Sequence, residues 1–227
     1  MMTMEKQQAW SYSSLDAFET CPYRWKLTKL IKTVQDPPNA AGLWGNRVHK
    51  GLEDYIKTRT PLPEDVKQFQ PMVDSVIARA KGKQLHAEQK ICLDRNFSPV
   101  SWFDKKAWVR GITDFTIEGS ERLFIGDWKT GKQIPNSSQL RLTAAMAFAT
   151  KSWIQEVTTA FVWIKTGKVD KEVIEREEAP DIWQEFLPRV KRLQDAIDQD
   201  KFPKRPSGLC ANYCPVGKAN CEHCGKP

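Results

Sequence analysis

The chain has 227 residues, about one and a half times the length of an ordinary domain, so it is long enough to bury a real core. With 40% hydrophobic residues, nine Trp and ten Phe, it is too apolar to be intrinsically disordered. Its formal net charge of +7 favours a polyanionic partner, and no apolar run approaches the ~20 residues of a membrane span. The N-terminal residues also lack the apolar stretch of a secretion signal, which predicts a cytoplasmic protein.

Hydrophobic residues recur at helical spacing in the first third of the chain, where Ser11, Ser13 and Ser14 are candidate N-caps for the first helix. The predicted helices cover residues 15–30, 43–59, 64–81, 139–150 and 181–200. Short alternating segments predict strands over residues 85–93, 107–117, 123–129, 156–165 and 168–176. This order predicts one α/β (α+β) domain over residues 1–227, with an N-terminal helical part (10–82), a sheet core (83–178) and a C-terminal helix and tail (179–227).

Two acidic residues stand in otherwise apolar strands. Alternation along residues 123–129 places Asp127 and Lys129 on one face, together with aliphatic side chains. Asp114 lies in the preceding predicted strand, and a hairpin would bring the two carboxylates together at one end of the sheet. Carboxylates that close repel each other unless a hard cation such as Mg²⁺ or Mn²⁺ lies between them. The pattern therefore predicts a divalent-metal site beside Lys129, and the simpler alternative is a surface Asp–Lys pair.

The predicted helix over residues 43–59 carries His49 and Glu53 one turn apart. His49 lies at the border of the apolar stripe, from which a neutral imidazole can reach a metal at the top of the sheet. The alternative interpretation is a histidine at the edge of the core, hydrogen-bonded to the backbone.

Five segments follow one another in a characteristic order. They are SYSSLDAFETCPYRWKL, GNRVHKGLEDYI, GITDF, IGDWKTGK and SSQLRLTAAMAFA, which together cover residues 11–149. In this order and spacing they resemble the PD-(D/E)XK nucleases of the RecB type, including the iron–sulfur nucleases of CRISPR adaptation and compact phage exonucleases. The resemblance implies a restriction-endonuclease-like core, in which helices flank a central mixed sheet.

The resemblance also implies a role for each matching residue. The implied ligands of Mg²⁺ or Mn²⁺ are His49, Asp114, Asp127 and the backbone carbonyl of Trp128. Lys129 would position or activate the attacking water, and Gln139 would support the site or touch the substrate. Glu53 and Glu88 are further candidates for an outer or second-metal position. The chain departs from the family at Thr143, where a Tyr is usual.

The implied activity is hydrolysis of DNA phosphodiester bonds by a divalent-metal-dependent nuclease. It would be an exonuclease acting on single-stranded or duplex ends in phage or bacterial recombination, repair or genome processing, with recombination or replication proteins as partners. Two alternatives stay open: a non-catalytic nucleic-acid-binding protein with a vestigial acidic site, and a nuclease that acts on RNA. The candidate stacking surfaces for single-stranded ends are Trp10, Tyr12, Tyr23 and Trp25.

Six cysteines, four of them in the last 18 residues, indicate a metal centre rather than disulfides. The resemblance implies a [4Fe–4S] cluster that docks the C-terminal tail on the N-terminal helix. Its implied ligands are Cys21, Cys210, Cys214 and Cys221, with Cys224 as an alternative fourth. The rival interpretation is a structural Zn²⁺ site formed by the four tail cysteines, with His223 able to replace one of them. Cys92, alone in an apolar strand, is predicted to be a packing residue.

Overall fold

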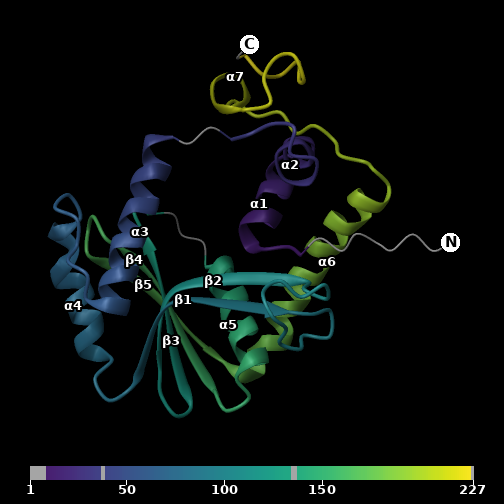
Figure 1. The fold of residues 1–227 in the computed structure, drawn as a ribbon. Helices are drawn as coiled ribbons and strands as arrows, with labels where there is room; N and C mark the ends of the chain where they lie inside the picture. Colours follow the sequence, from purple (N-terminus) through teal and green to yellow (C-terminus); the bar gives the residue numbers. More distant parts are fainter. Residues whose placement is uncertain (1–8, 37–38, 134–136, 226–227) are drawn as a thin grey trace. The chain divides into compact units, whose positions relative to one another are not determined.

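The computed structural model describes residues 9–36, 39–133 and 137–225 (Figure 1). The described chain divides into two compact units. The first comprises residues 39–133 and 137–184 together with Ala9, and the second comprises residues 10–36 and 185–225. The second unit therefore joins two segments that are far apart in the sequence.

A five-stranded mixed sheet forms the centre of the first unit. Its strands are β1 (Gln84–Leu93), β2 (Val109–Glu118), β3 (Arg122–Lys129), β4 (Glu156–Trp163) and β5 (Lys168–Glu175), in the spatial order β1-β2-β3-β4-β5. Neighbouring strands are antiparallel, except that β3 and β4 run parallel. Every predicted strand is present, and the predicted α+β fold class with a mixed sheet flanked by helices is confirmed.

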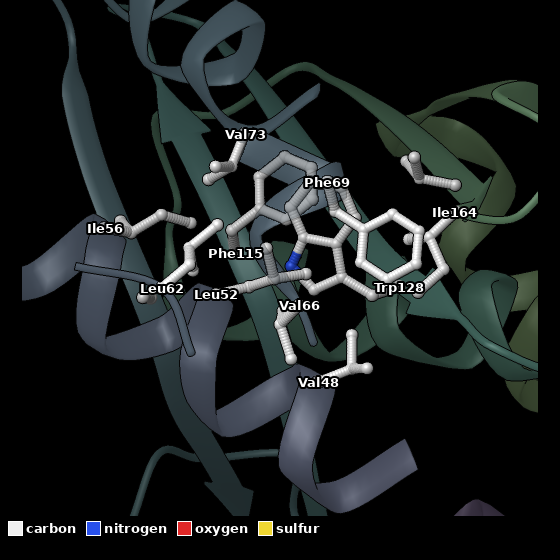
Figure 2. Close-up of a cluster of buried hydrophobic side chains, with 12 residues drawn as sticks. Val48, Leu52, Ile56, Leu62, Val66, Phe69, Val73, Phe115, Trp128 and Ile164 are labelled. Carbon is white, nitrogen blue, oxygen red and sulfur yellow. The ribbon is translucent and has the colours of Figure 1, made fainter. Parts of the chain in front are cut away.

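The helices of the first unit are α3 (Ala40–Thr58), the 3-10 helix η2 (Lys67–Phe69), α4 (Gln70–Arg79), α5 (Ser138–Thr150), the 3-10 helix η3 (Arg176–Glu178) and the start of α6 (Ala179–Asp198). Helices α3 and α4 pack on one face of the sheet. Figure 2 shows the core that results, in which Val48 and Leu52 of α3 and Val73 of α4 surround the rings of Phe115 and Trp128. This packing fixes the ends of β2 and β3 that carry the candidate site residues.

Gly126 is required where β2 and β3 pair. The ring of Phe115 lies directly across it, and a Cβ at position 126 would come within 2.0 Å of a ring carbon. Phe115 is fully buried and cannot move aside without opening the core. The absence of a side chain at Gly126 therefore lets Phe115 and Trp128 pack together, with ring centroids 4.6 Å apart.

The helices of the second unit are α1 (Tyr12–Thr20), α2 (Pro22–Trp25), the π-helix η1 (Lys26–Leu30), the remainder of α6 and α7 (Cys210–Tyr213). Ser11 is the N-cap of α1, as predicted. The prediction of one continuous helix over residues 15–30 is wrong. Cys21 adopts an extended conformation between α1 and α2, because Pro22 disfavours a helical residue before it.

The Cys-rich tail packs on the N-terminal segment within the second unit. Leu27, Val216, Cys221 and Cys224 form a buried cluster there. The Tyr23 hydroxyl donates a hydrogen bond to the carbonyl of Asn220 at 3.1 Å. The predicted docking of the tail on the N-terminal helical segment is confirmed. None of the described helices is both long enough and apolar enough to cross a membrane.

Candidate active site

Asp114 and Asp127 lie where strands β2 and β3 separate. The β2–β3 ladder ends at the pair Phe115 and Gly126, so each aspartate is the next residue beyond the last pair. The N–H of Trp128 donates a hydrogen bond to Asp114 Oδ2 at 2.7 Å instead of to a backbone carbonyl of β2. The Asp114 carboxylate thus accepts a backbone hydrogen bond from β3. The carboxyl groups of Asp114 and Asp127 both lie at this end of the β2–β3 pair.

His49 reaches this point from helix α3. Its Nδ1 lies 3.1 Å from Asp114 Oδ1, while the preceding residue, Val48, anchors the helix in the core. Burial acts to lower the pKa of His49, but the hydrogen bond and charge of Asp114, with the charge of Asp127, outweigh burial and raise it. The neighbouring carboxylates thus favour the protonated imidazole, the form that a metal ligand has to give up.

Asp127, Lys129 and Gln139 form a closed network. Gln139 Nε2 donates a hydrogen bond to Asp127 Oδ1 at 3.1 Å, and Lys129 Nζ donates one to Gln139 Oε1 at 3.2 Å. Lys129 Nζ also lies 2.7 Å from Asp127 Oδ2, so the ammonium and the carboxylate form an ion pair. Because Gln139 lies in the first turn of α5, one helix fixes both charged groups at the end of β3.

The positive charges beside Asp127 do not fully offset the effect of its burial. Burial, followed by repulsion from Asp114, raises the pKa of Asp127 to about 6 despite the opposing charges of Lys129 and His49. Among the ion pairs of the described residues, its buried Oδ2 meets only the Lys129 ammonium. Two carboxylates beside an imidazole are a donor set that suits Mg²⁺ or Mn²⁺, so these residues fit a divalent cation. Across the described ranges, no three His, Cys, Asp or Glu side chains already form a group that could hold a metal.

Phe161 is a residue of this site that sequence reasoning missed. It lies opposite Asp127 in the parallel pairing of β3 with β4, and the Lys129 ammonium lies 4.7 Å from the centroid of its ring. The buried ring thus provides a cation–π contact that holds the ammonium in place. Thr143, where the chain departs from the family, donates its hydroxyl to the carbonyl of Gln139 at 2.9 Å. It therefore supports the helical turn that carries Gln139.

Glu53 and Glu88 lie close to each other. Lys57 and Lys50 approach the Glu53 carboxylate to 2.5 and 3.3 Å. Burial acts to raise the pKa of Glu53, but hydrogen bonds from Lys57, Glu88 and Lys50 outweigh it and lower the pKa. Glu88 has a φ of +53° in the middle of β1, an unusual conformation for a residue other than glycine. These contacts give Glu53 a local ion-pair role, and a metal-binding role for either carboxylate stays a prediction.

The cysteines predicted to bind a metal come together in the second unit. One small cavity of about 20 Å³ is lined by Cys21, Cys210, Cys214, Cys221, His223 and Cys224, among other residues. Burial and the neighbouring thiols of Cys214 and Cys221 raise the pKa of Cys224 to about 12. Cys92 is buried in β1, as expected of a packing residue. Thiols from both segments of the second unit thus line one cavity, and a metal centre formed by four of them stays a prediction.

Two of the aromatic residues expected to stack on nucleic-acid ends are core residues instead. Trp10 and Trp25 are only 3% and 1% exposed. Trp10 stacks on Phe186, and Trp25 stacks on Phe202. For these two tryptophans the prediction is wrong, because residues about 180 positions further along the chain cover them.

The sequence model of the PD-(D/E)XK nuclease superfamily matches residues 9–222. Among curated proteins, none matches the chain. A solved structure described as "Crystal structure of SSO0001" is 13% identical with a TM-score of 0.46, and the match covers 97% of this chain and 88% of that chain. A likeness at this level carries no argument about activity. The family match spans nearly the whole sequence, and it includes every residue of the His49, Asp114, Asp127, Lys129 and Gln139 site: this chain belongs to the PD-(D/E)XK nuclease superfamily.

Proposed function

We propose that this protein is a divalent-metal-dependent DNA nuclease, an exonuclease that acts on single-stranded or duplex ends in bacterial or phage recombination, repair or genome processing. The observation that carries the proposal is the convergence of His49, Asp114, Asp127 and Lys129 from α3, β2 and β3. Membership of the superfamily supports metal-dependent nuclease activity in general. The choice of a polyanionic substrate is further supported by the net charge of +7.

Each residue of the site has a defined part in this proposal. The residues that would hold Mg²⁺ or Mn²⁺ are His49, Asp114, Asp127 and the carbonyl of Trp128. When bound, such an ion polarises a phosphoryl oxygen and lowers the pKa of a coordinated water. Lys129 orients the attacking water and offsets the negative charge that develops on the phosphate. Gln139 fixes Lys129 relative to Asp127, because its amide is bonded to both.

The variant Asp127→Ala tests this assignment. With Mg²⁺ or Mn²⁺ present, we expect hydrolysis of linear DNA to fall to background, because the buried cation ligand is lost. Asp54→Ala is the matched control, since Asp54 pairs only with Lys50 on the surface of α3 among the ion pairs of the described residues. Its activity should stay within about twofold of wild type. Full activity in Asp127→Ala would contradict the proposed site.

The form of the substrate is tested with three matched nucleic acids. Linear DNA should be degraded, while covalently closed circular DNA of the same sequence should resist, because an exonuclease needs an end. Cleavage of the circle would refute the exonuclease part of the proposal. Faster hydrolysis of an RNA of the same sequence would refute the choice of DNA.

We further propose that the cysteine site holds a [4Fe–4S] cluster. The proposed ligands are Cys21, Cys210, Cys214 and Cys221, with Cys224 as an alternative fourth. The support is that Cys21 lines the same cavity as the tail cysteines, whereas a zinc site made by the tail alone has no need of it. The cluster would join the two segments of the second unit and take no part in hydrolysis.

The colour and metal content of anaerobically purified protein test the cluster. We expect brown protein with a broad absorption band near ~400 nm, typical of iron bound by thiolates. Cys21→Ser should lose the colour and the iron, and Cys92→Ser, in the other unit, should keep both. Colourless protein with stoichiometric zinc would rule the cluster out.

A further inference from the structure

The loop between β1 and β2 (residues 94–108) displays an aromatic side chain to solvent. Phe103 is 87% exposed. The loop that carries it is nevertheless well anchored, because Asp94 Oδ1 accepts hydrogen bonds from two backbone N–H groups at 2.8 and 2.9 Å. At its base, Phe97 packs against Trp108 and Trp183, with centroid distances of 5.7 and 4.5 Å. The exposure of Phe103 is thus a property of an ordered loop.

Two positively charged side chains lie beside the other aromatic residue of this part of the loop, Trp102. The charged groups of Lys90 and Arg110 are 5.6 and 5.4 Å from the centroid of its ring. Neither cation forms an ion pair with a carboxylate in the part of the chain that the structure describes, although Arg110 also lies against the Cys92 thiol. The acids of the loop offset these cations only in part, since residues 90–110 contain five Lys and Arg residues against two acids, Asp94 and Asp104. The surface therefore combines an exposed ring with an excess of positive charge that suits an anion.

Strand β2 leads directly from this loop to the candidate active site. Arg110 precedes Asp114 by four residues, a distance of about 13 Å along an extended strand. Over this stretch β2 pairs with β1 but not with β3, because the β2–β3 ladder is confined to residues 115–118 of β2. Ile112, midway, is 46% exposed. The exposed side chain of Ile112 and the edge of β2 that β3 leaves unpaired therefore lie between the candidate site and the loop.

We propose that the β1–β2 ribbon and its loop bind the single-stranded segment of a DNA substrate. Trp102 and Phe103 stack against bases, and Lys90, Lys105 and Arg110 contact phosphates. The inference rests on the proposed nuclease function. It specifies that the substrate has a single-stranded segment. Charge complementarity favours a polyanion, and the exposed rings favour unpaired bases, because paired bases hide their faces from a protein ring. Aromatic rings with cations nearby meet both needs of a flexible, single-stranded chain.

Binding measured without hydrolysis tests the proposal. The full-length protein in EDTA is titrated against a fluorescein-labelled 20-mer of thymidine and against a labelled 20-base-pair duplex, with fluorescence anisotropy as the readout. Phe103→Ala should weaken binding of the thymidine 20-mer about tenfold, the size expected for loss of one stacked base. Binding of the duplex should change less than about twofold. Because Phe103 is solvent-exposed, this substitution leaves the core intact.

Trp153→Ala is the matched control for the ring. Trp153 is 50% exposed and lies in the segment before β4, at the opposite end of the sheet from Lys129. It should bind both oligonucleotides as wild type does. Lys105→Glu should lower the dependence of single-strand binding on salt, because one phosphate contact is lost. Lys81→Glu, which makes the same charge change before the start of β1, should leave that dependence unchanged.

The outcomes separate this inference from the proposed function. If wild type degrades DNA but Phe103→Ala binds the thymidine 20-mer within about twofold of wild type, the inference is wrong and the nuclease proposal stands. If Phe103→Ala weakens single-strand and duplex binding equally, the loop does not select unpaired bases, and the inference is again wrong. If wild type neither binds nor degrades DNA, both proposals fail.

Discussion

Replacement of Asp127 by asparagine should stabilise the metal-free protein. Burial and the nearby Asp114 carboxylate raise the pKa of Asp127 to about 6, well above the ordinary value of 3.8. The folded protein therefore keeps a proton on Asp127 that the unfolded chain releases at a lower pH. A shift of this size corresponds to a cost of up to about 3 kcal/mol for holding the charged carboxylate at neutral pH. Asparagine keeps the shape and the hydrogen bond from Gln139 but carries no charge.

The difference in stability between the wild type and Asp127→Asn should depend on pH. Below pH ~4 Asp127 is protonated in both states, so the wild type and Asp127→Asn should have similar free energies of unfolding. As the pH rises from about 4 to about 6, the unfolded chain ionises first and the wild type loses stability relative to the variant. Above pH 6 the difference should be constant, with the variant more stable by up to about 3 kcal/mol.

Urea denaturation in EDTA, followed by tryptophan fluorescence, measures this difference at several pH values. The buried ring of Trp128, next in sequence, reports on the same region. Adding Mg²⁺ or Mn²⁺ should then stabilise the wild type and leave Asp127→Asn unchanged, because a cation that binds the folded state shifts its stability by mass action. Asp16→Asn, at an exposed position on α1, should have no effect in either condition. A wild type at least as stable as Asp127→Asn at pH 7.5 in EDTA would refute the reasoning.

Two further substitutions test the packing around the site. Gly126→Ala should lower the free energy of unfolding by at least about 2 kcal/mol, because its methyl group would overlap the ring of Phe115, whereas Gly131→Ala, with open space around it, should be neutral. Thermal denaturation of the two variants side by side decides this, and equal melting temperatures would contradict it. Phe161→Leu should reduce the single-turnover rate of DNA hydrolysis about fivefold to thirtyfold without weakening DNA binding, because Lys129 loses its cation–π contact, and Phe161→Tyr should restore the rate. An unchanged rate in Phe161→Leu would exclude the positioning role.

Local patterns in the sequence were sufficient to predict most helices and strands and part of the candidate site. Alternation in β3 placed Asp127 and Lys129 opposite Trp128, and the structure agrees, since Trp128 lies in the core while the two charged groups meet Gln139 of α5. The hairpin of β2 and β3 was also visible in the sequence, and it brings Asp114 to the same end. These inferences succeed because each depends on the period of one element or on a short connection.

The remaining features depend on partners that are distant in sequence. No local pattern shows that β3 pairs in parallel with β4, so the contact of Phe161 with Lys129 was not foreseen. The burial of Trp25 depends on Phe202, at the other end of the chain. The break at Cys21 is a different case. Pro22 disfavours a helical residue before it, but the helical spacing of the apolar residues on both sides favoured one continuous helix.

The second unit can fold only late during synthesis, because it joins two segments that are far apart in the sequence. Arg189 binds Glu19 through two hydrogen bonds, and Tyr23 binds Asn220, so the first helices have their partners about 170 and 197 residues later in the chain. The sheet of the first unit draws all of its strands from the interior of the sequence and can form while the tail is still being translated. The residues of α1 and α2 leave the ribosome well before their partners, so Trp25 stays uncovered until Phe202 has been synthesised. During that interval the apolar surface of these helices is open to aggregation in the newly made chain.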